Sequence, residues 1–218
     1  KKRAFAENHR LRKVVFPESL ERLGAQAYQE CNTLRIVKFP NNSRCMVISE
    51  AVFDSCVNLT TVRLPLRTQV IERRAFYRCK ELKEINLPVT VREIGEEAFY
   101  FCAMEKLELP PNLKVIGESA FFRCKHLREV YIPESVKKIG RWAFHGCSRL
   151  ERLEILHDPD EIGQWIINKS CTLVCRKGSK ADHYAKEYGF KCEYVEEICQ
   201  FSAYAPGNAY RECKPAAG

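Results

Sequence analysis

Hydrophobic and polar residues alternate over short stretches that recur along the chain. In the clearest stretch, 82–88, Ile85 and Leu87 lie on either side of Asn86, and Pro88 ends the segment. In a β-strand, Ile85 and Leu87 share one face and Asn86 lies on the other. Proline has no N–H for a strand ladder, so it ends the strand. The same pattern recurs at 34–40, 59–65 and 127–133.

An aromatic residue marks each copy of a longer repeat. At intervals of 23, 25, 23, 23, 22 and 23 residues, the chain has Phe5, Tyr28, Phe53, Phe76, Phe99, Phe121 and Phe144. Three residues after these come, in order, Asn8, Cys31, Cys56, Cys79, Cys102, Cys124 and Cys147. A segment of this length cannot bury its own apolar side chains, so neighbouring copies must stack around a shared core.

A second apolar pair follows the proline of most copies and is often followed by glycine. Val91, Ile94 and Gly95 are one example. We expect this glycine to occupy a turn that needs positive φ. The alanine and aromatic residue that follow supply a small side chain for close approach and a large one for the core.

The motif Cys-x-x-Leu-x-x-Ile-x-Leu-Pro, followed by Val-x-x-Ile-Gly-x-x-Ala-Phe-x-x-Cys, resembles the leucine-rich repeats of bacterial BspA-like proteins. It covers residues 4–156, about 70% of the chain. The resemblance implies a right-handed leucine-rich-repeat solenoid, an α/β-type superhelix with a parallel sheet along one face and turns or short helices elsewhere. It further implies a non-enzymatic protein-binding scaffold that is secreted or held at the cell surface. A cytoplasmic location is the alternative, because the sequence shows no signal peptide.

Three copies depart from this pattern. The third is expanded around 41–47, the fifth is one residue short near Ala103 and Met104, and the first has Asn8 in place of cysteine. We expect these departures to change the local curvature and to leave the fold intact.

The repeat pattern fades after Ile155 and divides the chain into three parts. We expect seven repeats of about 23 residues over 1–156, a strand-helix-strand cap over 157–195 and a loosely packed tail over 196–218. Within the cap, strands are predicted at 171–175 and 190–195. Ser179 is expected to cap a helix, with Asp182 at its third position and Gly189 just beyond its end.

Composition and charge add a second hypothesis for function. The chain has 218 residues, 45% of them hydrophobic and 29% charged, and no apolar run approaches the length of a membrane-spanning helix. Lys and Arg exceed Asp and Glu by 36 − 28 = 8, and six of the basic residues lie within 1–13. Binding of a polyanion or nucleic acid through the basic N-terminal repeats is therefore the alternative to protein binding.

The chain has twelve cysteines, six of them at the same repeat position. Stacked strands lie about 4.8 Å apart, so these six would form a ladder of buried thiols. Reduced thiols are favoured because each has two equivalent neighbours, but distance alone leaves bridging between adjacent rungs open. A zinc site built from Cys192, Cys199 and Cys213 is a further alternative. The prediction is that the protein needs no cofactor and no metal.

The outward residues of the strands would form columns whose charge changes from basic in the first repeats to mixed and acidic in the last. One interpretation is a solvated surface. The other is a docking strip for a protein or peptide of complementary charge, with Tyr131 as its aromatic anchor. The residues expected to contact a partner are Arg12, Lys13, Arg35, Lys38, Arg63, Lys83, Glu105, Glu108, Glu129, Tyr131, Glu151 and Glu154.

Catalytic patterns are not evident in the sequence. The histidines fall at unrelated repeat positions, and there is no nucleophile elbow, phosphate loop or His-Glu-x-x-His motif. We therefore expect a protein that is not an enzyme.

Overall fold

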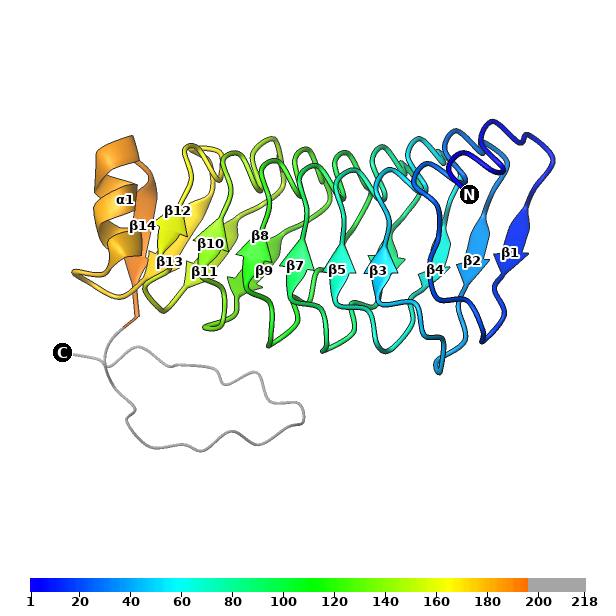
Figure 1. Ribbon diagram of the computed structural model, residues 1–218. Helices are drawn as coiled ribbons and strands as arrows, with labels where there is room; N and C mark the ends of the chain where they lie inside the picture. Colours follow the sequence, from blue (N-terminus) through cyan, green and yellow to red (C-terminus); the bar gives the residue numbers. More distant parts are fainter. Residues whose placement is uncertain (196–218) are drawn as a thin grey trace.

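A computed structural model describes residues 1–195, so the tail predicted for 196–218 and the cysteines Cys199 and Cys213 lie outside the described residues. The chain forms an elongated solenoid of stacked coils, with the N-terminus near one end and α1 (Lys180–Tyr188) at the other (Figure 1). All strand pairing is parallel, between adjacent coils. The solenoid predicted from the repeat is confirmed.

The predicted strands form the first of two strand layers. Its N-terminal part is a four-stranded sheet of β1 (Lys13–Val15), β2 (Ile36–Lys38), β4 (Thr61–Arg63) and β6 (Glu84–Ile85). Its C-terminal part is a four-stranded sheet of β9 (Glu129–Ile132), β11 (Arg152–Ile155), β13 (Thr172–Cys175) and β14 (Lys191–Tyr194). Between β6 and β9, the fifth repeat contributes no strand to the first layer, so that layer is interrupted there.

A second parallel sheet, which the sequence did not predict, is built from the second apolar pairs. It consists of β3 (Val47–Ile48), β5 (Val70–Ile71), β7 (Glu93–Ile94), β8 (Val115–Ile116), β10 (Lys138–Ile139) and β12 (Glu161–Ile162). Each of these strands has only two residues, too few for an alternating pattern to be recognised in a sequence. Through β12 and β13, both layers continue beyond residue 156.

The aromatic residues stack along the solenoid axis and fill its core. From Phe53 to Phe144 each ring is fully buried, and the centroids of successive rings lie 5.1–5.5 Å apart. The first ring, Phe5, is half exposed and packs on Tyr28 alone. Because each interior ring contacts the coil before and the coil after it, the core exists only in the stack.

The repeated cysteines line the same core as free thiols. Each Sγ donates a hydrogen bond to the carbonyl oxygen of the aromatic residue in the preceding coil; for Cys79 the acceptor is Phe53 O, 3.2 Å away. The series extends from Cys31 to Cys147. Burial raises the pKa of the Cys79 thiol well above its ordinary value, so these thiols are neutral hydrogen-bond donors.

The glycine that follows the second apolar pair has a different role from the one predicted. In the part of the chain that the structure describes, positive φ among glycines occurs at Gly146, Gly178 and Gly189, and not at Gly95 or Gly117. A Cβ added to Gly117 would lie 2.5 Å from the carbonyl carbon of Gly95. Glycine is therefore needed because the backbones of adjacent coils approach closely at this point.

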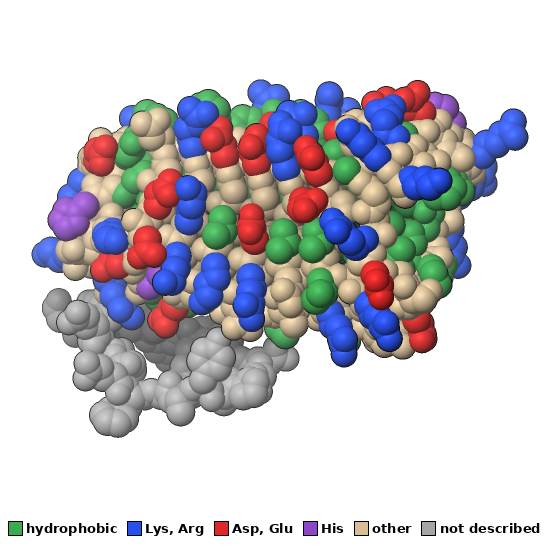
Figure 2. All heavy atoms as spheres, viewed as in Figure 1, with side chains coloured by type: hydrophobic (Ala, Val, Ile, Leu, Met, Phe, Trp, Pro, Cys, Tyr) green, Lys and Arg blue, Asp and Glu red, His purple; other side chains and the backbone are tan. Residues whose placement is uncertain are grey.

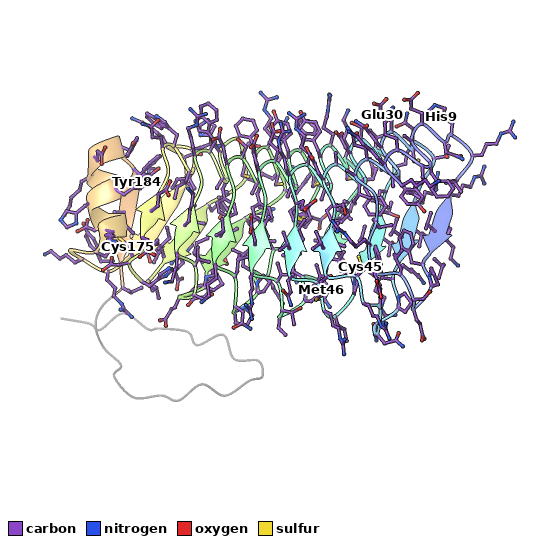
Figure 3. The ribbon with its side chains drawn as sticks, in the orientation of Figure 1. His9, Glu30, Cys45, Met46, Cys175 and Tyr184 are labelled. Carbon is purple, nitrogen blue, oxygen red and sulfur yellow. The ribbon has the colours of Figure 1, made fainter. Side chains whose placement is uncertain are left out.

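A short helix covers the C-terminal end of the stack, as predicted. The Ser179 side chain accepts a hydrogen bond from the N–H of Asp182, and Gly189 ends the helix in a left-handed conformation. The Tyr184 hydroxyl accepts a hydrogen bond from the N–H of Ile166 in the last coil, at 3.0 Å (Figure 3). Hydrogen bonds from Lys186, Gly178 and other donors lower the pKa of Asp182 to about 2. The helix is thereby fixed to the stack. No helix within residues 1–195 is long and apolar enough to cross a membrane.

Candidate protein-binding surface

The outward residues of the first strand layer form straight columns because the strands pair in a constant register. One column contains Lys13, Ile36, Thr61 and Glu84. The other contains Val15, Lys38 and Arg63. Beyond the interruption, Glu129 pairs with Arg152 and Tyr131 with Glu154. We call these two columns, the residue before each strand, and Glu105 and Glu108 at the interruption the sheet face. Its N-terminal half lies within residues 12–63 and its C-terminal half within residues 83–154. Their register agrees with the columns expected from the sequence.

The N-terminal half of the sheet face is basic. Its cations are Arg12, Lys13, Arg35, Lys38 and Arg63, all of them exposed. Within residues 1–195 none of the five forms an ion pair with a carboxylate. Lys38 and Arg63 are direct register partners on adjacent strands, and like charges placed opposite each other in a sheet are destabilising. This half therefore carries charge that does not help the fold.

The second sheet and the turns beside it show the opposite arrangement. There, acidic and basic residues of adjacent coils pair with each other, at 2.7–3.4 Å: Glu50–Arg73, Arg73–Glu96, Glu118–Arg141 and Lys138–Glu161. In the view of Figure 2, acidic and basic side chains lie next to each other in places, and basic side chains also gather by themselves. Beside the same sheet, Arg92, Lys114 and Lys137 of successive coils are exposed cations without an ion pair in the described chain. Charge is therefore balanced at some positions beside the second sheet, whereas the basic half of the sheet face has no ion pair among its five cations.

The C-terminal half of the sheet face is mixed to acidic. Lys83 lies 3.8 Å from Glu105, and Arg128 lies 3.4 Å from Glu151. A third acidic residue, Glu154, is half-buried, and burial raises its pKa while nearby Arg152 lowers it.

The remaining expected contact residues of this half, Glu108, Glu129 and Tyr131, are exposed, with Tyr131 at 47%. The structure thus places eleven of the twelve expected contact residues on the open surface and Glu154 partly beneath it.

A groove occupies the interruption of the first strand layer, where the C-terminal half of the sheet face begins. It has a volume of about 530 Å³ and is lined by residues 84–87, 89, 105, 106 and 108–111. Its apolar surface includes half-buried Ile85 and Leu109 and 62% exposed Val89. Its carboxylates come from Glu84, Glu105 and Glu108. We call this feature the sheet groove.

The groove follows from the missing residue of the fifth repeat. Met104 fills the buried position that Leu82 and Leu127 fill in neighbouring coils, but it comes two residues after the cysteine instead of three. After this shorter turn, the N–H of Glu105 donates a long hydrogen bond, 3.4 Å, to the carbonyl oxygen of Lys83. Residues 106–109 make no backbone hydrogen bond to either neighbouring coil in the described chain. The missing residue is visible in the sequence, from which only a change of local curvature was predicted.

The BspA type leucine rich repeat region, a family model matched in six copies, covers residues 1–126 and 46–175 of the chain. These overlapping matches span most of the sequence and agree with the stacked coils described above. The chain belongs to this family.

Solved structures agree with this membership in the BspA-type family. A leucine-rich repeat protein from Bacteroides ovatus is similar at 25% identity with a TM-score of 0.61, over 76% of this chain and 48% of that one. A leucine rich cell surface protein from Faecalibacterium prausnitzii is similar at 28% identity with a TM-score of 0.60, over 65% of this chain and 38% of that one. The chain therefore spans less than half the length of either protein. A search of curated proteins found no match.

BspA-type repeats and their solenoid fold are typical of non-enzymatic scaffolds. Among residues 1–195 no group of three or more His, Cys, Asp or Glu side chains could hold a metal ion. Ring nitrogens of His157 and His145 lie 2.7 and 3.3 Å from the backbone carbonyls of Val136 and Ile167, contacts within the fold. Cys192 lies 3.2 Å from Cys175, sulfur to sulfur; its other proposed zinc partners fall outside the described residues.

Proposed function

We propose that this chain is a protein-binding module of the secreted or cell-surface kind, and that the sheet face is where its partner docks. The partner presents an acidic surface to the N-terminal half of the sheet face and a more basic one to the C-terminal half. Tyr131 lies in the second half as an aromatic anchor, since tyrosine is enriched where binding energy is concentrated. The cell-surface setting is supported by the description of the Faecalibacterium prausnitzii protein.

The observation that carries this proposal is the unpaired charge of the basic half. Lys38 and Arg63 face each other in register and form no ion pair in the described chain, whereas Arg73 pairs with carboxylates on both sides. A surface shaped for stability alone would repeat the second arrangement. Uncompensated charge is retained where it attracts and orients a partner of opposite charge.

The test is a charge reversal with a matched control. The double variant Lys38→Glu/Arg63→Glu inverts the basic half, and Lys114→Glu/Lys137→Glu makes the same change of charge at exposed positions next to the second sheet. Each protein is immobilised and used to capture partners from extracts and culture medium of the source organism, with quantitative mass spectrometry as the readout. Partners should be retained by the wild type and the control and lost by the first variant. Equal capture by all three would contradict the proposal.

Polyanion binding is the second candidate, and the same five unpaired cations favour it. If it holds, the wild type should be retained on a heparin column and eluted at a salt concentration that falls sharply for Lys38→Glu/Arg63→Glu. Failure of the wild type to bind heparin at low salt would eliminate polyanion binding and leave binding of a protein partner as the function.

A further inference from the structure

We infer that the sheet groove binds an extended peptide segment that carries basic side chains next to apolar ones and hydrogen-bonds to the unpaired backbone of residues 106–109. This inference rests on the proposed function, because it assigns a partner chemistry to one part of the sheet face. It concerns the groove and not the basic half of the sheet face.

The backbone of the groove is the first reason. Residues 106–109 run alongside β6 and β9 without a backbone hydrogen bond to either neighbouring coil in the described chain, whereas elsewhere the coils of this layer are joined by strand ladders. Strand-like segments with free N–H and C=O groups recognise other extended chains by pairing with them. An extended peptide supplies the donors and acceptors that the shortened repeat leaves without partners.

The apolar surface is the second reason. Val89 is 62% exposed and lies at the groove beside half-buried Ile85 and Leu109. Next to it exposed Pro111 adds rigid apolar surface and has no N–H to donate. Burying such surface against an apolar side chain is favourable at about 25 cal/mol per Å². A volume of about 530 Å³ is within the range of sites that enclose a ligand.

Charge selects the class of peptide. Within residues 1–195, the groove is lined by three carboxylates, from Glu84, Glu105 and Glu108, and by one cation, Lys106. Of the three, Glu105 is paired with Lys83, and Glu84 and Glu108 form no ion pair within residues 1–195. These two carboxylates come from different coils, so they face a ligand from both walls. A basic peptide satisfies them, whereas a nucleic acid is repelled. Among the described residues that line the groove, none has an aromatic side chain that could stack on a sugar.

A labelled hexapeptide tests this inference. Fluorescein-labelled Lys-Val-Arg-Leu-Lys-Val is titrated with the full chain, and binding is followed by fluorescence anisotropy at physiological salt. Hexalysine carries positive charge without apolar side chains, and the same hexapeptide N-methylated at alternate residues keeps its side chains but lacks half its backbone donors. We expect both control peptides to bind at least tenfold more weakly than the hexapeptide. Equal binding of either, or no binding of the hexapeptide, would overturn the inference.

Variants of the chain locate the site. Glu108→Lys should weaken hexapeptide binding at least tenfold, and Glu93→Lys, the same change at an exposed position of β7, should leave it within twofold. Insertion of one lysine between Cys102 and Ala103 restores the spacing of the other repeats and should abolish binding by closing the sheet. Circular dichroism shows whether the insertion variant is folded. If it is unfolded, the affinity of Glu108→Lys for the hexapeptide determines whether the peptide binds in the groove. An unchanged affinity in Glu108→Lys would place the peptide elsewhere.

The two proposals fail separately. Lys38→Glu/Arg63→Glu lies outside the groove and should bind the hexapeptide as the wild type does. If the hexapeptide does not bind while partner capture still depends on Lys38 and Arg63, the groove assignment is wrong and the proposed function stands. If the hexapeptide binds as expected and capture is indifferent to these residues, the docking strip is wrong and the groove stands.

Discussion

Each interior side chain of the core is held by its equivalents in the coils before and after it. Phe76 lies between Phe53 and Phe99, with ring centroids 5.5 and 5.3 Å away, and the thiol of Cys79 donates to the carbonyl of Phe53. One position thus repeats the same contact along the whole axis. The energetic consequence of a substitution depends on whether a coil has neighbours on both sides.

Replacing an interior ring should be far more costly than replacing the terminal one. We expect Phe76→Ala to lower the unfolding free energy by about 3–5 kcal/mol, because a large cavity opens between two rings. Phe5→Ala is the control: Phe5 is half exposed and stacks on one ring only, so its loss should cost about 1 kcal/mol or less. Urea denaturation measures both. Similar losses for the two variants would contradict the stacked core.

The buried thiols should make the fold sensitive to alkali. Burial raises the pKa of Cys79 in the folded state, whereas in the unfolded chain the thiol ionises near pH 8.5. Its contribution to stability is therefore complete below that pH and is lost as the pH rises. Between about pH 9.5 and 10.5, the unfolding free energy of Cys79→Ala should fall by about 1.4 kcal/mol less than that of the wild type. Denaturation curves at the two pH values provide the measurement. Equal losses of unfolding free energy in the wild type and in Cys79→Ala would show that the thiol ionises in the folded protein.

The coils themselves are held together by backbone hydrogen bonds at several places around each turn. At the turns, the N–H of Arg78 donates to Tyr100 O at 2.7 Å and that of Arg123 to His145 O at 2.9 Å, although both residues have positive φ. Beside the second sheet, the N–H of Gly117 donates to Ile94 O at 2.7 Å. At Gly117, the backbones of adjacent coils approach more closely than a side chain permits.

A methyl group at the close approach should disrupt the stack. In Gly117→Ala the new Cβ meets the backbone of Gly95 and Glu96 at 2.5 and 2.6 Å, so we expect a loss of about 3 kcal/mol from overpacking. Gly178→Ala has no atom within 4 Å of its Cβ and a positive φ, so it should lose about 1–2 kcal/mol from backbone strain alone. Thermal denaturation ranks the two, and a smaller effect at Gly117 would refute the steric explanation.

Across the whole molecule, charge is distributed unevenly between the two strand layers. At several positions of the second sheet and its turns, such as Arg73 and Arg141, charges pair from coil to coil, whereas the basic half of the sheet face places Lys38 opposite Arg63. If this charge serves the binding role proposed above, stability and binding should respond in opposite directions to the same substitution.

Arg63→Glu should therefore stabilise the fold while weakening the binding of an acidic partner. Converting the like-charged pair with Lys38 into an opposite pair is expected to add about 0.5 kcal/mol at low salt, and this gain should vanish at about 1 M salt. Arg73→Glu is the matched control and should destabilise, because Arg73 pairs with both Glu50 and Glu96. Differential scanning calorimetry at the two salt concentrations distinguishes the variants. Destabilisation by Arg63→Glu would mean that the basic half is already balanced.

The sequence by itself determined the repeat, the core and the columns of the sheet face. The alternation around Ile85 and the fixed spacing of the aromatics specify which side chains must be buried, and stacking at that spacing places Lys38 opposite Arg63. Local capping chemistry likewise specified α1, because Ser179 and Gly189 act on their own helix. These features depend on periodicity or on nearest neighbours along the chain.

The second sheet, the role of Gly117 and the sheet groove were decided only by the tertiary structure. A two-residue strand such as β7 exists because a neighbouring coil pairs with it, and the need for glycine arises where two coils meet. The groove opens because the turn after Cys102 is one residue too short for the following segment to reach the strands on either side. In each case the deciding contact is with another coil, and the distance between the two coils cannot be predicted from the identity of the contacting residues.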